Sequence, residues 1–242
     1  MNDAQESSLH QLDQSSKDKQ EIFLQKIASK LGRSRIIEKP DQPFRGAPEF
    51  WNNFDYSTEA KVKMFTANFE AAGGHVVQFE KMEETGRWIA QTATELGAHH
   101  ILRQDQEELE ALDLESSLLS AEITVWNRDK SQDGKANAAE ADIGIVIADC
   151  AVAYTGSIIL LSGQQKGRSV SLLPTALIAI IPVHLLVTRL GEKLVEFDHL
   201  GEERLPAGIH FISGPSRSAD IENDLTIGVH GPGIVYAVLV NE

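Results

Sequence analysis

Residues 139–174 read AEADIGIVIADCAVAYTGSIILLSGQQKGRSVSLLP, and this stretch decides the fold of the chain. Within it, residues 143–148 alternate isoleucine with glycine, valine and alanine. A strand built from these residues is apolar on both faces, as expected for a strand that helices cover on each side. We therefore expect residues 143–148 to lie in the middle of a sheet.

A second apolar run, residues 158–161, follows the turn Thr155-Gly156-Ser157, where glycine can adopt a backbone conformation that strains other residues. The loop GQQKGRS comes next, at residues 163–169, with two glycines and the cations Lys166 and Arg168. Backbone amides and positive side chains can approach an anion together in such a loop. The loop therefore predicts a site for an anionic ligand, and a solvated surface loop is the alternative.

The whole chain has 242 residues, of which 42% are hydrophobic, enough for one large or two small domains. Its formal net charge of −14 repels phosphate backbones and anionic lipids, which argues against a nucleic acid or an anionic membrane as partner. The longest apolar stretch, residues 176–183, is too short to cross a bilayer, and the first 20 residues contain no apolar signal segment. These features predict a cytoplasmic protein without membrane insertion.

A single cysteine, Cys150, excludes an intramolecular disulfide and cannot supply the several thiolates of an iron–sulfur cluster. Cys150 follows the buried strand, so we expect an inert thiol, with a nucleophile as the alternative. The pair His99-His100 has no acidic partner at the spacing of a metal site. The sequence therefore predicts no cofactor and no metal in this chain.

The first 50 residues predict an arm ahead of an α/β domain at residues 51–242. Residues 1–17 are polar and are expected to be mobile. Apolar residues every four positions predict an amphipathic helix over residues 18–31, and prolines make residues 39–48 an extended linker. This helix either docks onto a neighbouring subunit or packs onto its own domain.

Helical periodicity and short apolar runs alternate from residue 57 onward. The pattern predicts strands near residues 75–79, 99–103, 122–126, 177–181, 209–213 and 234–240, and helices near 57–72, 88–96, 105–112 and 185–197. Residues 129–138 are expected to form a polar loop. Strands separated by helices pair in parallel, which predicts an open, mostly parallel α/β sheet with helices on both faces. Ligands of such sheets bind outside the carboxyl ends of the strands.

The segment FISGPSRSADIE, residues 211–222, carries a second candidate site. A strand runs into Gly214-Pro215-Ser216 and then into a predicted helix start, where free amides favour an anion and Arg217 adds a charged contact. A purely structural turn is the alternative. The loop GVHGPG, residues 228–233, lets backbone approach a ligand and carries His230, whose ordinary pKa lies near neutrality.

Three motifs together resemble the lactate-utilization protein C family over residues 57–242: ADIGIVIADCAVAYTGS, then QQKGRS with VSLLP, then FISGPSRSADIE with GVHGPG. The resemblance implies a fold like that of the phosphosugar isomerase and coenzyme A transferase superfamily. It also implies a role in growth on L-lactate, beside two partner proteins that carry the iron–sulfur clusters. The single cysteine of this chain agrees with such a division of labour.

The chain departs from the family pattern at Tyr154, where related chains usually have an acidic residue immediately before Thr155. If that carboxylate is a nucleophile or base, as its counterpart is in coenzyme A transferases, this chain lacks it. Tyrosine can donate a hydrogen bond, but its ordinary pKa of about 10 makes it a poor base at neutral pH. The change argues against covalent chemistry on this chain alone.

The resemblance implies the first of three functions, and the residues themselves leave two others open. The first is a non-redox subunit in the oxidation of L-lactate to pyruvate, which binds a small anion and the iron–sulfur proteins. The second is an independent isomerase or acyl-transfer enzyme with Asp149, Asp220 or His230 as acid or base. The third is a regulatory or structural subunit. The catalytic candidates are Tyr154, Asp220 and His230, and the candidate ligand-binding residues are Thr155, Gly156, Lys166, Arg168, Ser169, Gly214, Ser216, Arg217 and Gly231.

Overall fold

The computed structural model describes residues 3–38, 54, 56–129, 134–219 and 225–241. Packing divides the chain into two compact units, Met1–Asn52 and Asn53–Glu242. Across the residues described, no helix is both long enough and apolar enough to span a membrane.

The first unit contains one long helix, α1 (Asp3–Lys30). Its start at Asp3 shows that the start predicted at residue 18 is wrong. Exposed contacts between side chains four positions apart support the polar half of the helix, as between Lys17 and Asp13 at 2.7 Å. Gly32, at φ +65°, ends the helix in the left-handed conformation that glycine adopts without strain.

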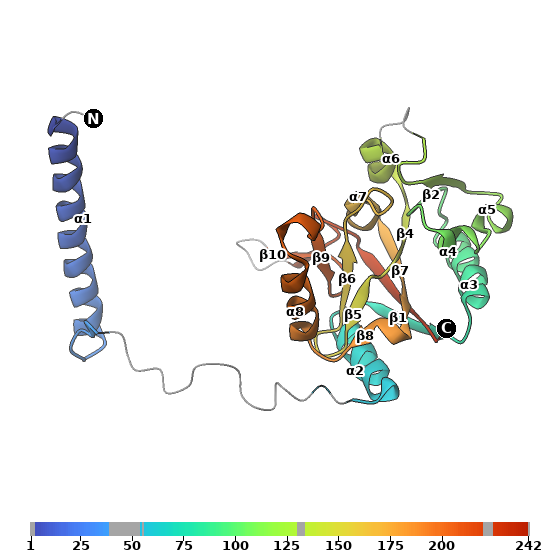
Figure 1. Ribbon diagram of the computed structural model, residues 1–242, viewed down its shortest axis with the longest axis horizontal. Helices are drawn as coiled ribbons and strands as arrows, with labels where there is room; N and C mark the ends of the chain where they lie inside the picture. Colours follow the sequence, from blue (N-terminus) through green and yellow to red (C-terminus); the bar gives the residue numbers. More distant parts are fainter. Residues whose placement is uncertain (1–2, 39–53, 55, 130–133, 220–224, 242) are drawn as a thin grey trace. The chain divides into compact units, whose positions relative to one another are not determined.

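A six-stranded parallel sheet forms the centre of the second unit, in the order β1-β12-β7-β4-β2-β3 (Figure 1). The strands are β1 (His75–Phe79), β2 (His100–Arg103), β3 (Glu122–Val125), β4 (Ile143–Ile147), β7 (Ala176–Pro182) and β12 (Ile234–Val240). All five residues of β4 are buried, and Ile145 pairs with Ile178 on one side and Arg103 on the other. The prediction of an interior strand at this position is confirmed.

Helices cover both faces of this sheet. On one face lie α2 (Thr58–Ala71), α6 (Gly134–Glu140) and α7 (Arg168–Leu172), and on the other α3 (Met82–Glu95), α4 (Glu107–Glu110) and α5 (Leu114–Ser117). Val146 belongs to the same buried cluster as Phe65 and Phe69 of α2, whereas Ile145 belongs to the cluster that contains Ile89 of α3. The predicted α/β class is therefore confirmed, but the loop predicted at residues 129–138 is wrong from Gly134 onward, where alanines favour α6.

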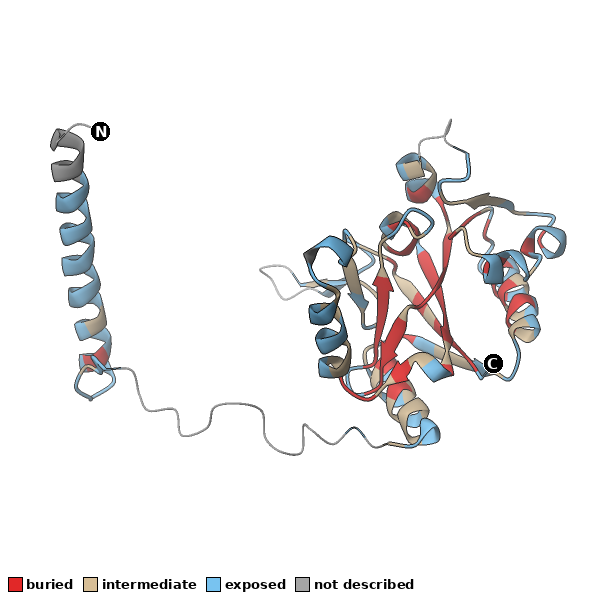
Figure 2. Cartoon of the chain, viewed as in Figure 1, coloured by how far each residue is buried: buried red, intermediate tan, exposed pale blue. Residues whose placement is uncertain are grey.

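A second sheet of four short strands lies beside α2 and was not predicted. Its order is β8-β5-β6-β9, with β5 and β9 antiparallel to β6 and with β8 parallel to β5. The strands are β5 (Cys150–Val152), β6 (Ser157–Leu161), β8 (Leu186–Val187) and β9 (Ile209–Ile212). Burial is concentrated in β4, β6 and β7, where both sheets meet the shared core (Figure 2).

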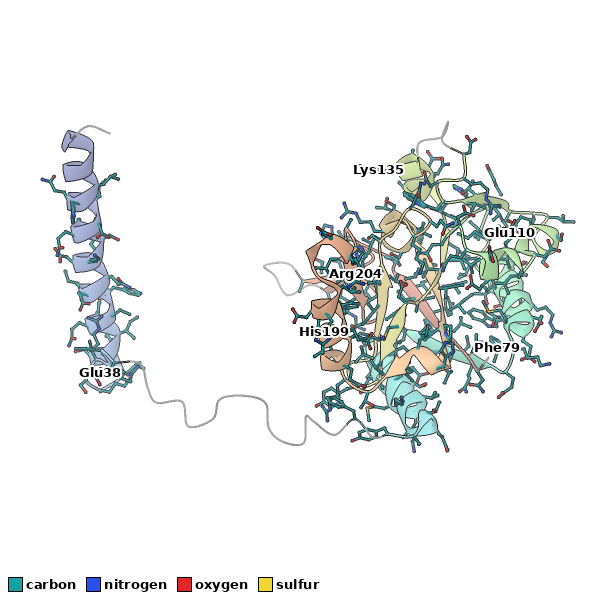
Figure 3. All side chains as sticks on the ribbon, viewed as in Figure 1. Glu38, Phe79, Glu110, Lys135, His199 and Arg204 are labelled. Atoms are coloured by element: carbon teal, nitrogen blue, oxygen red, sulfur yellow. The ribbon has the colours of Figure 1, made fainter. Side chains whose placement is uncertain are left out.

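The outer face of the second sheet packs against α8 (Leu190–Leu200), on the opposite side of the domain from α3 (Figure 1). This helix begins later than the predicted residue 185, because the short 3-10 helix η2 (Val183–Leu185) and β8 come first. After α8, η3 (Glu202–Arg204) follows, and Arg204 donates from Nε to the carbonyl of Leu200 at 3.0 Å (Figure 3). A cation at this position interacts favourably with the negative, carboxyl-terminal end of the helix dipole.

Candidate functional site

The loop of residues 228–233 leads into β12, and residues 172–175 lead into the neighbouring strand β7. The amide of Gly233 donates to the carbonyl of Thr175 at 2.9 Å and fixes the two segments side by side. They enclose a hollow of about 650 Å³, which we call the glycine-loop pocket; it is lined by Leu172, Leu173, Pro174, Thr175, Ile227, Gly228, Val229, His230, Gly231 and Gly233. The pocket therefore lies at the amino ends of two parallel strands, not at the carboxyl ends that the fold class favours.

Ser216 holds the loop of the glycine-loop pocket in shape through its backbone. Its amide donates to the carbonyl of Pro232 at 2.9 Å, and its carbonyl accepts from the amide of Gly228 at 2.9 Å. Gly228 has φ +80°, which glycine adopts without strain. A Cβ atom at Gly231 would lie 3.3 Å from the Cβ of Ser216, so the small residue lets the two loops approach.

The backbone amides of residues 229–231 indicate which kind of ligand this pocket can bind. None of the three donates a hydrogen bond to a partner in the described part of the chain. Among the described residues, none that lines the pocket is acidic, and the side chains of His230, Leu173 and Val229 are exposed. Successive unpaired amides beside an imidazole can hold a carboxylate, while the apolar side chains can accept a small alkyl group.

The loop of residues 163–169 lies at the carboxyl ends of β2 and β4, because the amide of Asp105 donates to the carbonyl of Gln165 at 3.1 Å. Lys166 is paired there: its Nζ lies 2.7 Å from Oδ1 of Asp149, and Oδ2 of Asp149 accepts from the amide of Leu161 at 2.8 Å. Much of the charge of Lys166 is therefore balanced within the protein.

Glycine in this loop has a packing role. A Cβ atom at Gly167 would enter the ring of Trp126. Ser169 is half-buried, and its carbonyl accepts from the amide of Leu173 at 3.1 Å within α7. Arg168 begins α7, is exposed, and makes no side-chain hydrogen bond or ion pair with the residues that the structure describes.

Ser162 and His210 form a polar pair next to this loop that sequence reasoning missed. Ser162 Oγ lies 3.0 Å from His210 Nε2, across the antiparallel strands β6 and β9. Burial and the charge of Arg168 lower the pKa of His210, which favours the neutral imidazole. This pairing depends on the register of β6 and β9. The sequence offers only a histidine two residues after Gly208, and that pattern is too common to predict the pair.

The turn at residues 155–157 packs against α2. Gly156 has φ +56°, and a Cβ atom there would lie 2.6 Å from the amide nitrogen of Phe69. Asn68 Nδ2 donates to the carbonyls of Ala153 and Tyr154 at 3.0 and 2.9 Å. These contacts give the turn a structural role, because they hold it against α2.

Two exposed candidates belong to the same turn. The guanidinium of Arg189 lies 4.6 Å from the ring centroid of Tyr154, which is a cation–π contact. Thr155 Oγ1 accepts a hydrogen bond from Ser157 Oγ at 2.7 Å, and Ser157 Oγ also lies 2.7 Å from Ser213 Oγ. Both candidate side chains are thus engaged within the protein.

Residues 214–217 surround the carboxyl end of α2. A Cβ atom at Gly214 would lie 2.9 Å from the carbonyl oxygen of Ala72, and the guanidinium of Arg217 lies against Gly73. A cation there interacts favourably with the negative end of the α2 dipole. The predicted helix start is wrong: β10 (Arg217–Ala219) pairs antiparallel with β11 (Leu225–Ile227). The catalytic candidate Asp220 lies outside the described residues.

The candidates thus fall into three places. The first is the glycine-loop pocket, which is lined by His230 and Gly231 and whose loop is held by Ser216. The second is the amino end of α7, with Lys166, Arg168 and Ser169. The third is the surface of α2, where the remaining described candidates lie. Cys150 is buried, and burial raises the pKa of its thiol to about 11, which favours the inert role. Across the described ranges, no three His, Cys, Asp or Glu side chains gather as metal ligands.

The LUD domain model matches residues 62–240. "Lactate utilization protein C" of Halalkalibacterium halodurans is 38% identical over 220 residues, covering 88% of this chain and 94% of the relative. The protein of the same name from Bacillus subtilis is 32% identical over 243 residues, covering 92% and 96%.

A solved structure supports the fold. The crystal structure of a DUF162 family protein from Deinococcus radiodurans superposes with a TM-score of 0.56 at 18% identity, covering 77% of this chain and 99% of that one. At this identity the likeness concerns the fold alone. The family is shown by the match over residues 62–240 and by the relatives above 30% identity. The chain belongs to the lactate-utilization protein C family and contains its LUD domain.

Proposed function

We propose that this protein acts in the cytoplasm in the utilization of L-lactate, as a subunit without its own redox centre. It binds a small carboxylate in the glycine-loop pocket and works with two iron–sulfur proteins that oxidise L-lactate to pyruvate. The observation that carries the proposal is that relatives named "Lactate utilization protein C" match 88–92% of the chain.

The chemistry of the pocket supports the choice of ligand. A 2-hydroxy acid offers a carboxylate, a hydroxyl and a short alkyl group. The unpaired amides of residues 229–231 suit the carboxylate, His230 suits the hydroxyl, and Leu173 and Val229 suit the alkyl group.

The cysteine content supports the division of labour. Oxidation of L-lactate to pyruvate releases two electrons and two protons. A single buried cysteine cannot ligate an iron–sulfur cluster, so in this scheme the electrons pass to clusters in the partner proteins. The chain then contributes ligand binding and assembly.

A negative charge at the pocket rim tests the proposal. Val229 is 52% exposed, so Val229→Glu should fold while repelling a carboxylate, and Val229→Gln controls for size. The tagged protein is purified from cells grown on L-lactate, and lactate-dependent electron transfer is measured in the eluate. We expect the iron–sulfur partners to be recovered with the tagged protein. Lactate-dependent electron transfer should fall about tenfold in Val229→Glu and stay nearly unchanged in Val229→Gln.

Two other outcomes would overturn the proposal. Recovery of the chain alone, with turnover of a phosphosugar or a coenzyme A thioester, would favour the independent isomerase or acyl-transfer enzyme. Recovery of the partners with equal activity in wild type and Val229→Glu would favour a purely structural or regulatory subunit.

A further inference from the structure

Thr175 is the residue directly before β7, and it lines the glycine-loop pocket. Its carbonyl accepts from the amide of Gly233 at 2.9 Å, and its amide donates to the carbonyl of Ala141 at 3.4 Å. Gly233 leads into β12, and Ala141 leads into β4. The backbone of Thr175 is therefore held from both sides by the segments that begin the neighbouring strands.

The side chain of Thr175 lies on the face of the sheet that α7 covers. Successive side chains of an extended segment point to opposite faces. Ala176 belongs to the buried cluster on the α3 side, whereas Leu177 belongs to the cluster that contains Val170 of α7. Thr175 therefore shares the face of Leu177, and its side chain is exposed in the pocket that Leu172, at the end of α7, also lines.

Among the described lining residues, Thr175 and His230 carry the side chains that can form hydrogen bonds, and the others are apolar or glycine. Both border one hollow of about 650 Å³, and the bond between Gly233 and Thr175 joins the segments from which they come. A threonine hydroxyl both donates and accepts, and a neutral imidazole donates with one nitrogen and accepts with the other. One hydroxyl group of a ligand can therefore donate to one of these side chains and accept from the other.

We infer that Thr175 makes the glycine-loop pocket specific for a 2-hydroxy acid. The inference rests on the proposed function, which places the ligand's carboxylate on the amides of residues 229–231. The hydroxyl on the next carbon of the ligand then lies between Thr175 and His230. A 2-oxo acid can only accept hydrogen bonds at that carbon, and an unsubstituted acid offers no hydrogen bond there. The expected order of affinity is L-lactate, then pyruvate, then propionate.

The hydroxyl of Thr175 is well suited to this selection because it is fixed before a ligand binds. Its backbone is tied to the starts of two strands, and a β-branched side chain has few χ1 rotamers. A group that is already ordered loses little conformational entropy on binding, so more of its hydrogen-bond energy contributes to affinity.

A structural role at the start of β7 is the alternative for Thr175, since β-branched residues suit strands. Two substitutions separate the roles. Thr175→Val keeps the shape and the strand preference but removes the hydroxyl. Thr175→Ser keeps the hydroxyl but removes the methyl group. Selectivity for a 2-hydroxy acid should follow the hydroxyl and not the shape.

Nuclear magnetic resonance on isotope-labelled full-length protein tests the inference. The amide signals of residues 229–231 are followed during titration with L-lactate, pyruvate and propionate. We expect Thr175→Val to weaken binding of L-lactate about tenfold and of propionate less than about twofold, and Thr175→Ser to bind L-lactate within about threefold of wild type. Thr226→Val is the control, because Thr226 of β11 is exposed and is not among the described lining residues; it should bind all three acids as wild type does.

Three outcomes would overturn the inference. Equal weakening of L-lactate and propionate in Thr175→Val, or no weakening of either, would show that Thr175 does not recognise the hydroxyl, while the carboxylate site of the proposed function would stand. Binding of L-lactate as weak in Thr175→Ser as in Thr175→Val would show that shape decides. If none of the three acids shifts the signals in wild type, the ligand in the proposed function is itself wrong, and the inference falls with it.

Discussion

Replacing Gly156 by alanine tests whether the turn at residues 155–157 is a structural support of α2. Two costs add at this position. Gly156 has φ +56°, which costs an L-residue about 1–2 kcal/mol. The new Cβ atom would also lie 2.6 Å from the amide nitrogen of Phe69 and 2.8 Å from the carbonyl carbon of Asn68. Because these are backbone atoms of a packed helix, overpacking adds about 1–3 kcal/mol.

Gly97 provides a matched control. Its φ is +64°, but nothing lies within 4 Å of a Cβ atom built there. Gly97→Ala should therefore cost only the conformational term, about 1–2 kcal/mol, while Gly156→Ala costs about 2–5 kcal/mol in total. The effect of alanine on the unfolded chain is shared by both variants and cancels in the comparison.

Urea unfolding of the two variants and wild type measures the difference. Fluorescence of Trp88 and Trp126 reports on the domain, and equal slopes would show that the unfolded states are comparable. Equal destabilisation by Gly156→Ala and Gly97→Ala would refute the packing argument. It would then favour an open turn at residues 155–157 that is free to close on a ligand.

Three further predictions concern buried and paired groups. Because the pKa of Cys150 is raised to about 11, iodoacetamide at pH 7 should label its thiol only after unfolding in urea, and rapid native labelling would contradict its burial. Hydrogen bonds from the amides of His100 and His99 lower the pKa of Asp142, so its stabilisation is present above the ordinary value of 3.8 and is lost as the pH falls through the folded value. The stability gap between wild type and Asp142→Asn should accordingly narrow in acid, and a constant gap would argue against the hydrogen bonds. Lys166→Met should lower the free energy of unfolding by about 1–2 kcal/mol in the wild-type background and by much less in the Asp149→Asn background, as measured by urea unfolding. Equal effects in the two backgrounds would show that Lys166 and Asp149 are not coupled.

The central sheet could be predicted because its strands are marked by local patterns. Residues 143–148 are apolar on both faces, and glycines mark the ends of helices such as α2, where Gly73 and Gly74 end the helix through bonds to Glu70 and Phe69. The second sheet could not be predicted in this way. Its strands are also short apolar runs, and the antiparallel pairing of β6 with β5 and β9 is decided by contacts between distant segments.

The candidate site was predictable in part for a similar reason. The loop of residues 228–233 stands out by its glycines and His230, and the structure places it in a pocket. The glycines at positions 156 and 214 stand out equally, yet they serve contacts with α2. The pairing of Lys166 with Asp149 spans 17 residues, and that of Ser162 with His210 spans 48. Such pairs depend on tertiary structure, so the spacing of residues in the sequence does not reveal them.

Growth of a strain that lacks this gene tests the central claim most directly. The account predicts that the strain fails to grow on L-lactate as sole carbon source but grows on pyruvate. Growth on L-lactate should return with the wild-type gene and with Val229→Gln, and should remain poor with Val229→Glu when both variants are present at equal levels. Normal growth of the deletion strain on L-lactate, in cells without a second copy of the gene, would contradict the account.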